Sequence, residues 1–371
     1  MTSKGLMSLT ALFSFFLNIT FGEQLTLKEA FNNDFLIGSA IDKRQFHEKD
    51  IETVDIVKTQ FNSVTSENIL KWESIHSSPN EYDFASSDQF VQFGQENKMF
   101  IIGHTLVWHQ QTPAWVFEDE EKKPIDRHTL LERLRDHIYT VVGRYKGKIH
   151  GWDVINEALN DDGTLRLTPW LKILGENYII QAFQFAHEAD PEAELYYNDY
   201  GLESPLKRAG AIALIRKIQE NGTPITAIGL QSHNTLDWPS TEQLEDTLVA
   251  FAKLGIKINI TELDIDVLPS AWQYQGLHVS SEMHTSLDPY VLTLPSLIDQ
   301  ALTRRYAELF RIYLKYQEKI NRVTFWGVTD RNSWLNDIPI KGRTNYPLLF
   351  DREGQPKPAF DAIISLKTGT F

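Results

Sequence analysis

The chain contains no cysteine among its 371 residues. This absence excludes disulfide bonds, thiolate metal sites and cysteine nucleophiles, as well as a lipid anchor on a processed N-terminal cysteine. Positive charge is also scarce, because 36 lysines and arginines face 50 aspartates and glutamates and leave a net charge of −14. A protein of that sign is unsuited to bind the phosphates of nucleic acids. We therefore expect no nucleic-acid partner.

Long hydrophobic runs are missing after the first 22 residues. Lys4 precedes an apolar stretch at 6–17, which is too short to cross a bilayer but has the length of a signal-peptide core. The small residue Gly22 suits a cleavage site. The prediction is a signal peptide at 1–22 and a mature domain at 23–371 that is secreted or periplasmic and has no membrane anchor.

The rest of the chain alternates between short apolar runs and charged amphipathic stretches. Runs with the character of strands occupy 36–41, 63–68, 99–109, 149–157, 194–200, 225–233, 256–264 and 323–330. Helical patterns lie between several of them, at 129–145, 177–189 and 297–320. Strands that alternate with helices indicate parallel sheet. Eight such units predict an α/β fold with a single (β/α)8 TIM barrel, since the glycine-rich fingerprint of the rival open sheet is missing.

Several of these runs begin apolar and end in carboxylates, histidines, asparagines or tryptophans. Barrel enzymes build their active sites at the carboxyl ends of the strands, where such side chains gather. In the run 256–264, strict alternation places four residues on one face, namely Ile258, Ile260, Glu262 and Asp264. In the run 149–157, alternation places Asn156 and Glu157 on opposite faces, so both reach one site only if the strand breaks there.

Glu157 and Glu262 suit the hydrolysis of a glycosidic bond. That reaction needs one carboxylic acid to protonate the departing oxygen and one carboxylate on the opposite side of the bond. The two glutamates end different runs, so the fold must bring them together. Taken alone, each is an ordinary glutamate, and such residues more often form structural ion pairs or caps than catalytic sites.

Several longer sequences occur in a characteristic order. They are ENILKW (67–72), GHTLVWHQQTP (103–113), WDVINEAL (152–159), YYNDY (196–200), GLQSH (229–233), ITELD (260–264), RYAELF (305–310) and WGVTDRNSW (326–334). In this order and spacing the chain resembles glycoside hydrolase family 10, the endo-β-1,4-xylanases, from about residue 25 to the C-terminus.

The resemblance implies a retaining mechanism and a role for each matching residue. Glu157 matches the general acid/base, Glu262 the nucleophile, and Asn156 the asparagine that hydrogen-bonds the 2-hydroxyl of the sugar. His233 matches the histidine that holds the nucleophile, with Asp264 as its supporting carboxylate. This arrangement is expected to keep Glu262 ionised while Glu157 stays protonated.

The resemblance also implies sugar contacts. On the donor side they are Glu67, Asn68, Lys71, His104, Trp108, Gln111 and Gln231; Tyr200 lines the leaving-group side, and Trp326 and Trp334 surround the cleavage point. Trp334 is expected to exclude the hydroxymethyl group that glucose has and xylose lacks. After NDY the family often carries asparagine where this chain has Gly201, so the leaving-group side is expected to differ.

We expect no cofactor and no catalytic metal, because His104 and His109 have no HExxH sequence and no cysteine to complete a site. The predicted partner is xylan with its oligosaccharides, bound by a monomer. Two alternatives remain open at this stage: a barrel enzyme acting on cellulose or mannan, and a non-catalytic carbohydrate-binding protein. Loss of either glutamate would indicate the latter, and both are present.

Overall fold

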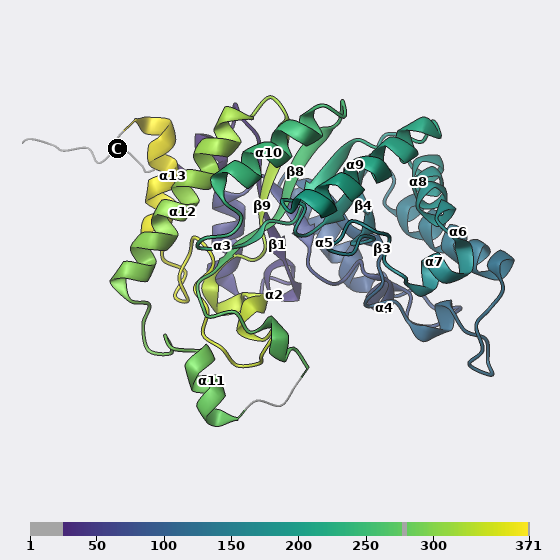
Figure 1. Ribbon diagram of the computed structural model, residues 1–371, viewed down its shortest axis with the longest axis horizontal. Helices are drawn as coiled ribbons and strands as arrows, with labels where there is room; N and C mark the ends of the chain where they lie inside the picture. Colours follow the sequence, from purple (N-terminus) through teal and green to yellow (C-terminus); the bar gives the residue numbers. More distant parts are fainter. Residues whose placement is uncertain (1–24, 277–279, 370–371) are drawn as a thin grey trace, which may run out of the picture.

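Eight parallel strands form a closed ring, and helices cover its outside (Figure 1). The computed structural model describes residues 25–276 and 280–369, so the predicted signal peptide at 1–22 lies outside the described residues. The ring strands are β1 (Leu36–Ile41), β2 (Ser63–Ser66), β3 (Phe100–Val107), β4 (Gly151–Asn156), β5 (Glu194–Asp199), β6 (Ala227–Leu230), β8 (Lys257–Asp266) and β9 (Ile320–Phe325). The ring closes because β9 pairs with β1 and β6 pairs with β8. The predicted (β/α)8 barrel is confirmed.

The connections between the strands carry the helices. The longer helices are α3 (Ile51–Gln60), α5 (Ala85–Glu96), α6 (Arg127–Arg144), α8 (Asn177–Ala189), α9 (Pro205–Glu220), α10 (Thr241–Ala252), α12 (Ser296–Lys315) and α13 (Pro358–Thr368). The short ones are α1 (Leu27–Ala30), α2 (Lys43–Phe46), α4 (Trp72–Ile75), α7 (Pro169–Leu174) and α11 (Ser281–Leu287), and single 3₁₀ turns form η1 (Ala114–Val116), η2 (Trp272–Tyr274), η3 (Asp330–Asn332) and η4 (Trp334–Asn336). The local sequence explains where some helices begin. Ser240 and Gln243, for example, form a capping box at the N-terminus of α10. In residues 25–276 and 280–369, no helix is long and apolar enough to span a membrane.

The predicted elements agree with the structure apart from their ends, except that the run predicted as one strand at 225–233 divides into β6 and a separate short strand, β7 (His233–Thr235), which pairs with β8. The strand expected at 323–330 is β9, which begins at Ile320 and ends at Phe325. It ends early because Gly327 has φ +131°, a backbone conformation outside the strand region that glycine readily adopts. The helix expected at 297–320 is α12, which ends at Lys315, because Ile320 belongs to the next strand.

Two apolar layers hold the barrel together. The main cluster packs the outward-facing strand residues against the helices and includes Leu195, Ile228 and Val323. A small separate cluster of Ile102, Tyr196 and Ala227 lies inside the ring. The positions above this cluster are polar. Towards the carboxyl ends of the strands, the side chains inside the ring therefore change from apolar, packed residues to residues that form hydrogen bonds, and a barrel enzyme has its active site at this end.

Strand β4 ends directly before Glu157. Its register against β5 shifts between Asp153 and Ile155, the strand ends at Asn156, and Glu157 has a left-handed φ of +56°. The prediction that the strand must break for Asn156 and Glu157 to reach one site is therefore confirmed. A non-glycine residue in this conformation is strained. Such backbone strain is concentrated at functional sites, where the direction of a side chain is important.

Strand β8 also departs from strict alternation. Ile258 and Ile260 pair in register with apolar residues of β6 and join the main cluster between sheet and helices. The register against β9 shifts between Ile260 and Leu263, and this irregularity turns Glu262 towards the barrel mouth. The prediction that Ile258 and Ile260 share a face with Glu262 is wrong, because a bulge between them changes the alternation.

Candidate active site

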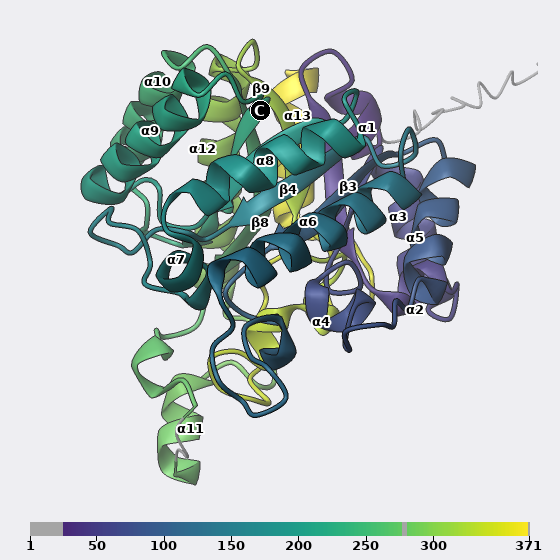
Figure 2. The same ribbon diagram turned by 90° about the vertical axis from the view of Figure 1, so that its right-hand side faces the viewer.

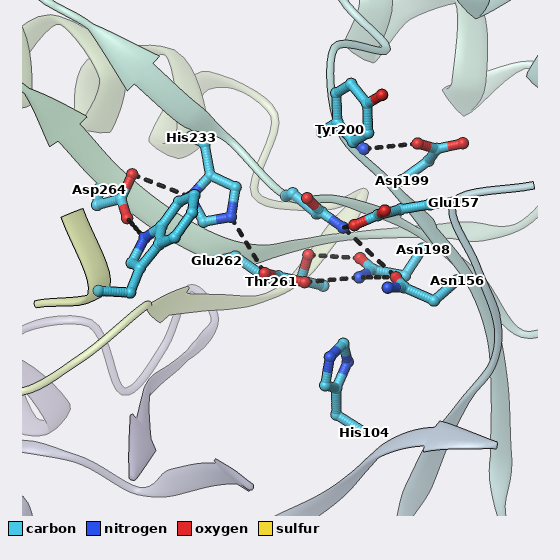
Figure 3. A network of polar contacts seen from close by, with 12 residues as sticks. His104, Asn156, Glu157, Asn198, Asp199, Tyr200, His233, Thr261, Glu262 and Asp264 are labelled. Atoms are coloured by element: carbon cyan, nitrogen blue, oxygen red, sulfur yellow. Dashed lines mark hydrogen bonds and ion pairs between the residues drawn. The ribbon is translucent and has the colours of Figure 1, made fainter. Parts of the chain in front are cut away.

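Glu157 and Glu262 lie at the same end of the barrel although they come from strands that are not neighbours. Glu157 directly follows β4, and Glu262 lies within β8. Three buried amides connect the two acids: Asn198 donates to Glu262 and Asn156, and Gln231 donates to Asn156 and Glu157 (Figure 3). The two candidate catalytic residues therefore share one polar network.

Glu262 is held by a histidine and an amide. Its Oε2 lies 3.1 Å from Nε2 of His233, and its Oε1 accepts a hydrogen bond of 2.8 Å from Nδ2 of Asn198. The other ring nitrogen of His233, Nδ1, lies 3.0 Å from Oδ1 of Asp264. The second oxygen of Asp264 accepts a 2.7 Å bond from the indole of Trp334. Each polar side-chain atom in this series of contacts has a partner, so the candidate nucleophile has a fixed orientation.

These contacts determine the charges of His233 and Glu262. Burial lowers the pKa of His233, but the charge and hydrogen bond of Asp264 and the hydrogen bond of Glu262 raise it to about 10. Burial raises the pKa of Glu262, but the hydrogen bond from His233 and the electrostatic effects of His104 and His233 bring it below its ordinary value. His233 is therefore a cation at neutral pH, and Glu262 is an anion.

Glu157 has a different environment. Its Oε2 accepts a 2.8 Å bond from the indole of Trp108, and its Oε1 accepts a 2.9 Å bond from Nε2 of Gln231. Arg166 donates to the main-chain oxygen of Glu157 at 3.1 Å, which fixes the strained backbone. The carboxyl of Glu157 thus meets two neutral donors, in contrast to the ion pair at Glu262.

Asn198 is a residue whose role sequence reasoning did not identify. It is fully buried, donates through Nδ2 to Oδ1 of Asn156 at 2.9 Å as well as to Glu262, and accepts at 2.6 Å from the hydroxyl of Thr261. Gly229 makes room for it, since a Cβ there would lie 2.3 Å from Oδ1 of Asn198. The available signal was a polar amide at the centre of YYNDY, in a run that was expected to form a strand.

The predicted donor-side residues form a second polar group beside Glu157. Lys71 donates to Oδ1 of Asn68 and to Oε1 of Gln111, both at 2.9 Å, and its ammonium lies 4.9 Å from the ring centre of Trp108. Burial lowers the pKa of Lys71, while Glu262, Glu67 and Glu157 raise it, and the net effect is a lowered value. Four of the seven sugar contacts predicted for this side, Asn68, Lys71, Trp108 and Gln111, are therefore side by side.

Two other predicted residues lie at the base of the site. His104 is buried and its Nδ1 lies 2.9 Å from Oδ2 of Asp153. Trp326 stands edge-on to His104 and to His233, with ring centres 5.3 and 6.4 Å apart. The described ranges, 25–276 and 280–369, contain no group of three or more histidines and acids that could hold a metal ion.

Tyr200 is fixed by two cations that sequence reasoning did not find. Its hydroxyl accepts a 3.0 Å bond from Arg166, and the ammonium of buried Lys207 lies 3.3 Å from the centre of its ring. Lys207 also pairs with Asp199 at 3.0 Å. Burial raises the pKa of Asp199 to about 6 against the opposing effect of Lys207. Gly201 follows with φ +62° and no side chain of its own.

Comparison with known proteins places this site in a family. The sequence model of glycosyl hydrolase family 10 matches residues 26–366. "Endo-1,4-beta-xylanase A" of Xylanibacter ruminicola is 43% identical over 345 residues, which cover 92% of this chain and 94% of that protein. "Beta-1,4-xylanase" of Dictyoglomus thermophilum is 42% identical over 341 residues, covering 91% and 90%. The solved structure of a GH10 endoxylanase from a sugarcane soil metagenome has a TM-score of 0.88 and 44% identity, covering 92% of this chain and 99% of that chain. The chain belongs to glycosyl hydrolase family 10.

Proposed function

We propose that this chain is an endo-β-1,4-xylanase that hydrolyses internal bonds of xylan with retention, using Glu262 as nucleophile and Glu157 as general acid/base. One observation carries the assignment of roles. Glu262 faces the cation of His233, whereas Glu157 accepts from the neutral groups of Trp108 and Gln231. Two carboxyls in contrasting environments suit one permanently ionised group and one group that exchanges a proton.

The reaction proceeds in two displacements. In the first, a carboxylate oxygen of Glu262 attacks the anomeric carbon, and Glu157 gives its proton to the departing oxygen, so that a covalent glycosyl-enzyme forms and the leaving sugar chain is released. In the second, the carboxylate of Glu157 takes a proton from water, the water oxygen attacks the anomeric carbon, and Glu262 departs as a carboxylate. Each residue returns to its starting state.

The buried amides support the transition state. Asn198 and Gln231 donate to Oδ1 of Asn156, which turns the amide nitrogen of Asn156 towards the sugar. From there it donates to the 2-hydroxyl, and a bond that strengthens in the transition state accelerates the reaction. Asn198 acts through Asn156 and Glu262, so it is a positioning residue.

Xylan is the proposed substrate for two reasons. The relatives at 42–43% identity are named xylanases. In addition, the indole of Trp334 donates a hydrogen bond to Asp264, and its ring centre lies 4.9 Å from that of His233. The indole therefore forms a fixed wall beside the nucleophile. Such a wall accepts xylose and obstructs the hydroxymethyl group of glucose.

We also propose that residues 1–22 direct export and that the mature chain acts as a monomer in the periplasm or outside the cell. The apolar run at 6–17 supports export. Sequencing the N-terminus of protein from the native host tests this directly, and an intact Met1 on an intracellular protein would contradict it. Sedimentation equilibrium of the mature chain tests the oligomeric state.

Parallel digestion of xylan, arabinoxylan, carboxymethylcellulose and mannan, with sizing of the products, tests the function. We expect short oligosaccharides from the first two polymers and little product from the others. Glu262→Ala should abolish product formation, while the matched control Glu245→Ala, an acid on the outer helix α10, should act like wild type. Equal cleavage of carboxymethylcellulose would assign a broader substrate class, and binding without product would overturn the enzymatic assignment.

A further inference from the structure

The loop between β8 and α12 presents an indole next to the active site. All nine tryptophans of the chain lie in its described part, and Trp272 is the only one of them that is exposed, with 45% of its surface accessible. Its ring centre lies 5.8 Å from that of Trp334, at an interplanar angle of 48°. Trp334 in turn packs on His233. The aromatic surface of the site therefore continues outwards onto Trp272.

The part of the loop that carries Trp272 is fixed to the barrel. The neighbouring residue Ala271 is fully buried in a small apolar cluster with Leu287 and Ile340. Arg343 donates to the main-chain oxygen of Pro269 at 3.1 Å. Figure 2 shows this loop, with α11, extending from the carboxyl-end face of the barrel. An exposed indole on an anchored segment is pre-positioned, so it binds a ligand without a large loss of conformational freedom.

The order of strands around the ring indicates which part of the substrate Trp272 faces. Around the closed ring the strands follow as β1, β2, β3, β4, β5, β6, β8, β9, so β8 lies across the mouth from β3. The donor-side group of Asn68, Lys71, Trp108 and Gln111 follows β2 and β3. An extended polysaccharide that enters over this group and passes the cleavage point leaves the mouth on the opposite side, where the loop after β8 begins.

We propose that Trp272 is a sugar-stacking residue of the leaving-group side, which binds a xylosyl unit of the substrate beyond the cleavage point. The flat indole face matches the apolar face of a pyranose ring, and aromatic faces at a wet rim suit such amphipathic ligands. Gly201 adds no side chain next to Tyr200 in this region, so Trp272 supplies further contact area from the other side of the cleft. The inference rests on the proposed xylanase activity.

The test is the position of cleavage in xylopentaose labelled with ¹⁸O at its reducing end, read by mass spectrometry. Weaker binding on the leaving-group side favours binding modes with more sugars on the donor side. In Trp272→Ala, cleavage should therefore move towards the reducing end, with the ratio of the two main product pairs changing about 3- to 10-fold. Trp272→Phe should restore much of the wild-type ratio. A ratio is independent of the fraction of folded enzyme, so a poorly folding variant still gives an answer.

Two further measurements complete the design. Trp272→Ala should lose more kcat/KM on xylopentaose than on an aryl xylobioside, which places no sugar on the leaving-group side. Leu292→Ala, at a 96% exposed residue of the same connecting loop, is the matched control and should keep the wild-type pattern. A shift towards the non-reducing end would assign Trp272 to the donor side, and equal losses on both substrates without a shift would mean that it only supports Trp334; either result overturns the proposal. If wild type fails to cleave xylopentaose, the proposed function itself fails, which is a distinguishable outcome.

Discussion

Replacing His233 with glutamine should raise the pH at which the enzyme loses activity in acid. The pKa of His233 rises from its ordinary 6.5 to about 10 because Asp264 and Glu262 outweigh the effect of burial. A rise of this size corresponds to about 5 kcal/mol in favour of the protonated form. His233→Gln removes that charge and leaves Glu262 buried beside Asp264, so burial should then dominate and raise the pKa of Glu262.

The sign of the pH dependence follows from the two shifts. Because the pKa of His233 is raised on folding, its contribution to stability is fully present below pH 6.5 and is lost as the pH rises to about 10. Because the pKa of Glu262 is lowered, its contribution is present above its ordinary value of 4.5 and is lost as the pH falls below it. The contact between His233 and Glu262 contributes to both shifts, so its energy is counted once, while Asp264 makes the larger contribution to the shift of His233.

Two assays measure the effect. In His233→Gln the acidic limb of kcat/KM on an aryl xylobioside should move up by about 1–2 pH units. The free energy of unfolding in guanidinium chloride at pH 7 should fall by about 3–5 kcal/mol, since a buried pair has lost one partner. That difference should shrink above pH 10. His128→Gln, at a histidine whose side chain is 80% exposed on α6, is the control. An acidic limb that stays in place in His233→Gln would refute the reasoning.

Three further substitutions test other parts of the site. Trp334→Ala should lower activity on xylan and narrow the preference for xylan over carboxymethylcellulose by about 10- to 200-fold, the range for a single pocket contact; an unchanged preference would show that another group excludes glucose. Asn198→Ala removes donors to both Asn156 and Glu262 and should lower kcat about 10- to 100-fold with a smaller effect on KM; a change in KM alone would limit it to substrate binding. Gly201→Asn adds a side chain at φ +62°, which asparagine tolerates, and should improve cleavage of short xylo-oligosaccharides more than of xylan; an equal change in both rates would contradict this.

The barrel was predictable because its signals are local. Each strand is a short apolar run, each helix has its own periodicity, and the polar ends of several strands mark the mouth. The break after Asn156 was predictable for the same reason, since alternation within 149–157 conflicts with a common site. The bulge in β8 was not, because it is a shift of register against β9 between Ile260 and Leu263. Register depends on a strand that lies about sixty residues away in sequence.

The supporting residues of the site were harder to predict for a related reason. Arg166 reaches Glu157 and Tyr200 only because the segment after β4 folds back, with the amide of Arg166 bonded to the main-chain oxygen of Ala158 at 2.7 Å. Lys207 is a charged residue near the start of a helix, which is normally exposed, yet it is fully buried under Tyr200. Side chains whose partners come from separate loops leave no periodic signal in the sequence.

The most direct test of the central claim is to locate the covalent intermediate. In Glu157→Ala an aryl xylobioside with an acidic phenol still reacts in the first step, because its leaving group departs without a proton from the enzyme. The second step lacks its base, so the glycosyl-enzyme should accumulate. Mass spectrometry of peptic peptides from the quenched enzyme should then find the xylobiosyl group on Glu262. Absence of any adduct after the release of phenol, or an adduct on another residue, would contradict the assignment of Glu262 as the nucleophile.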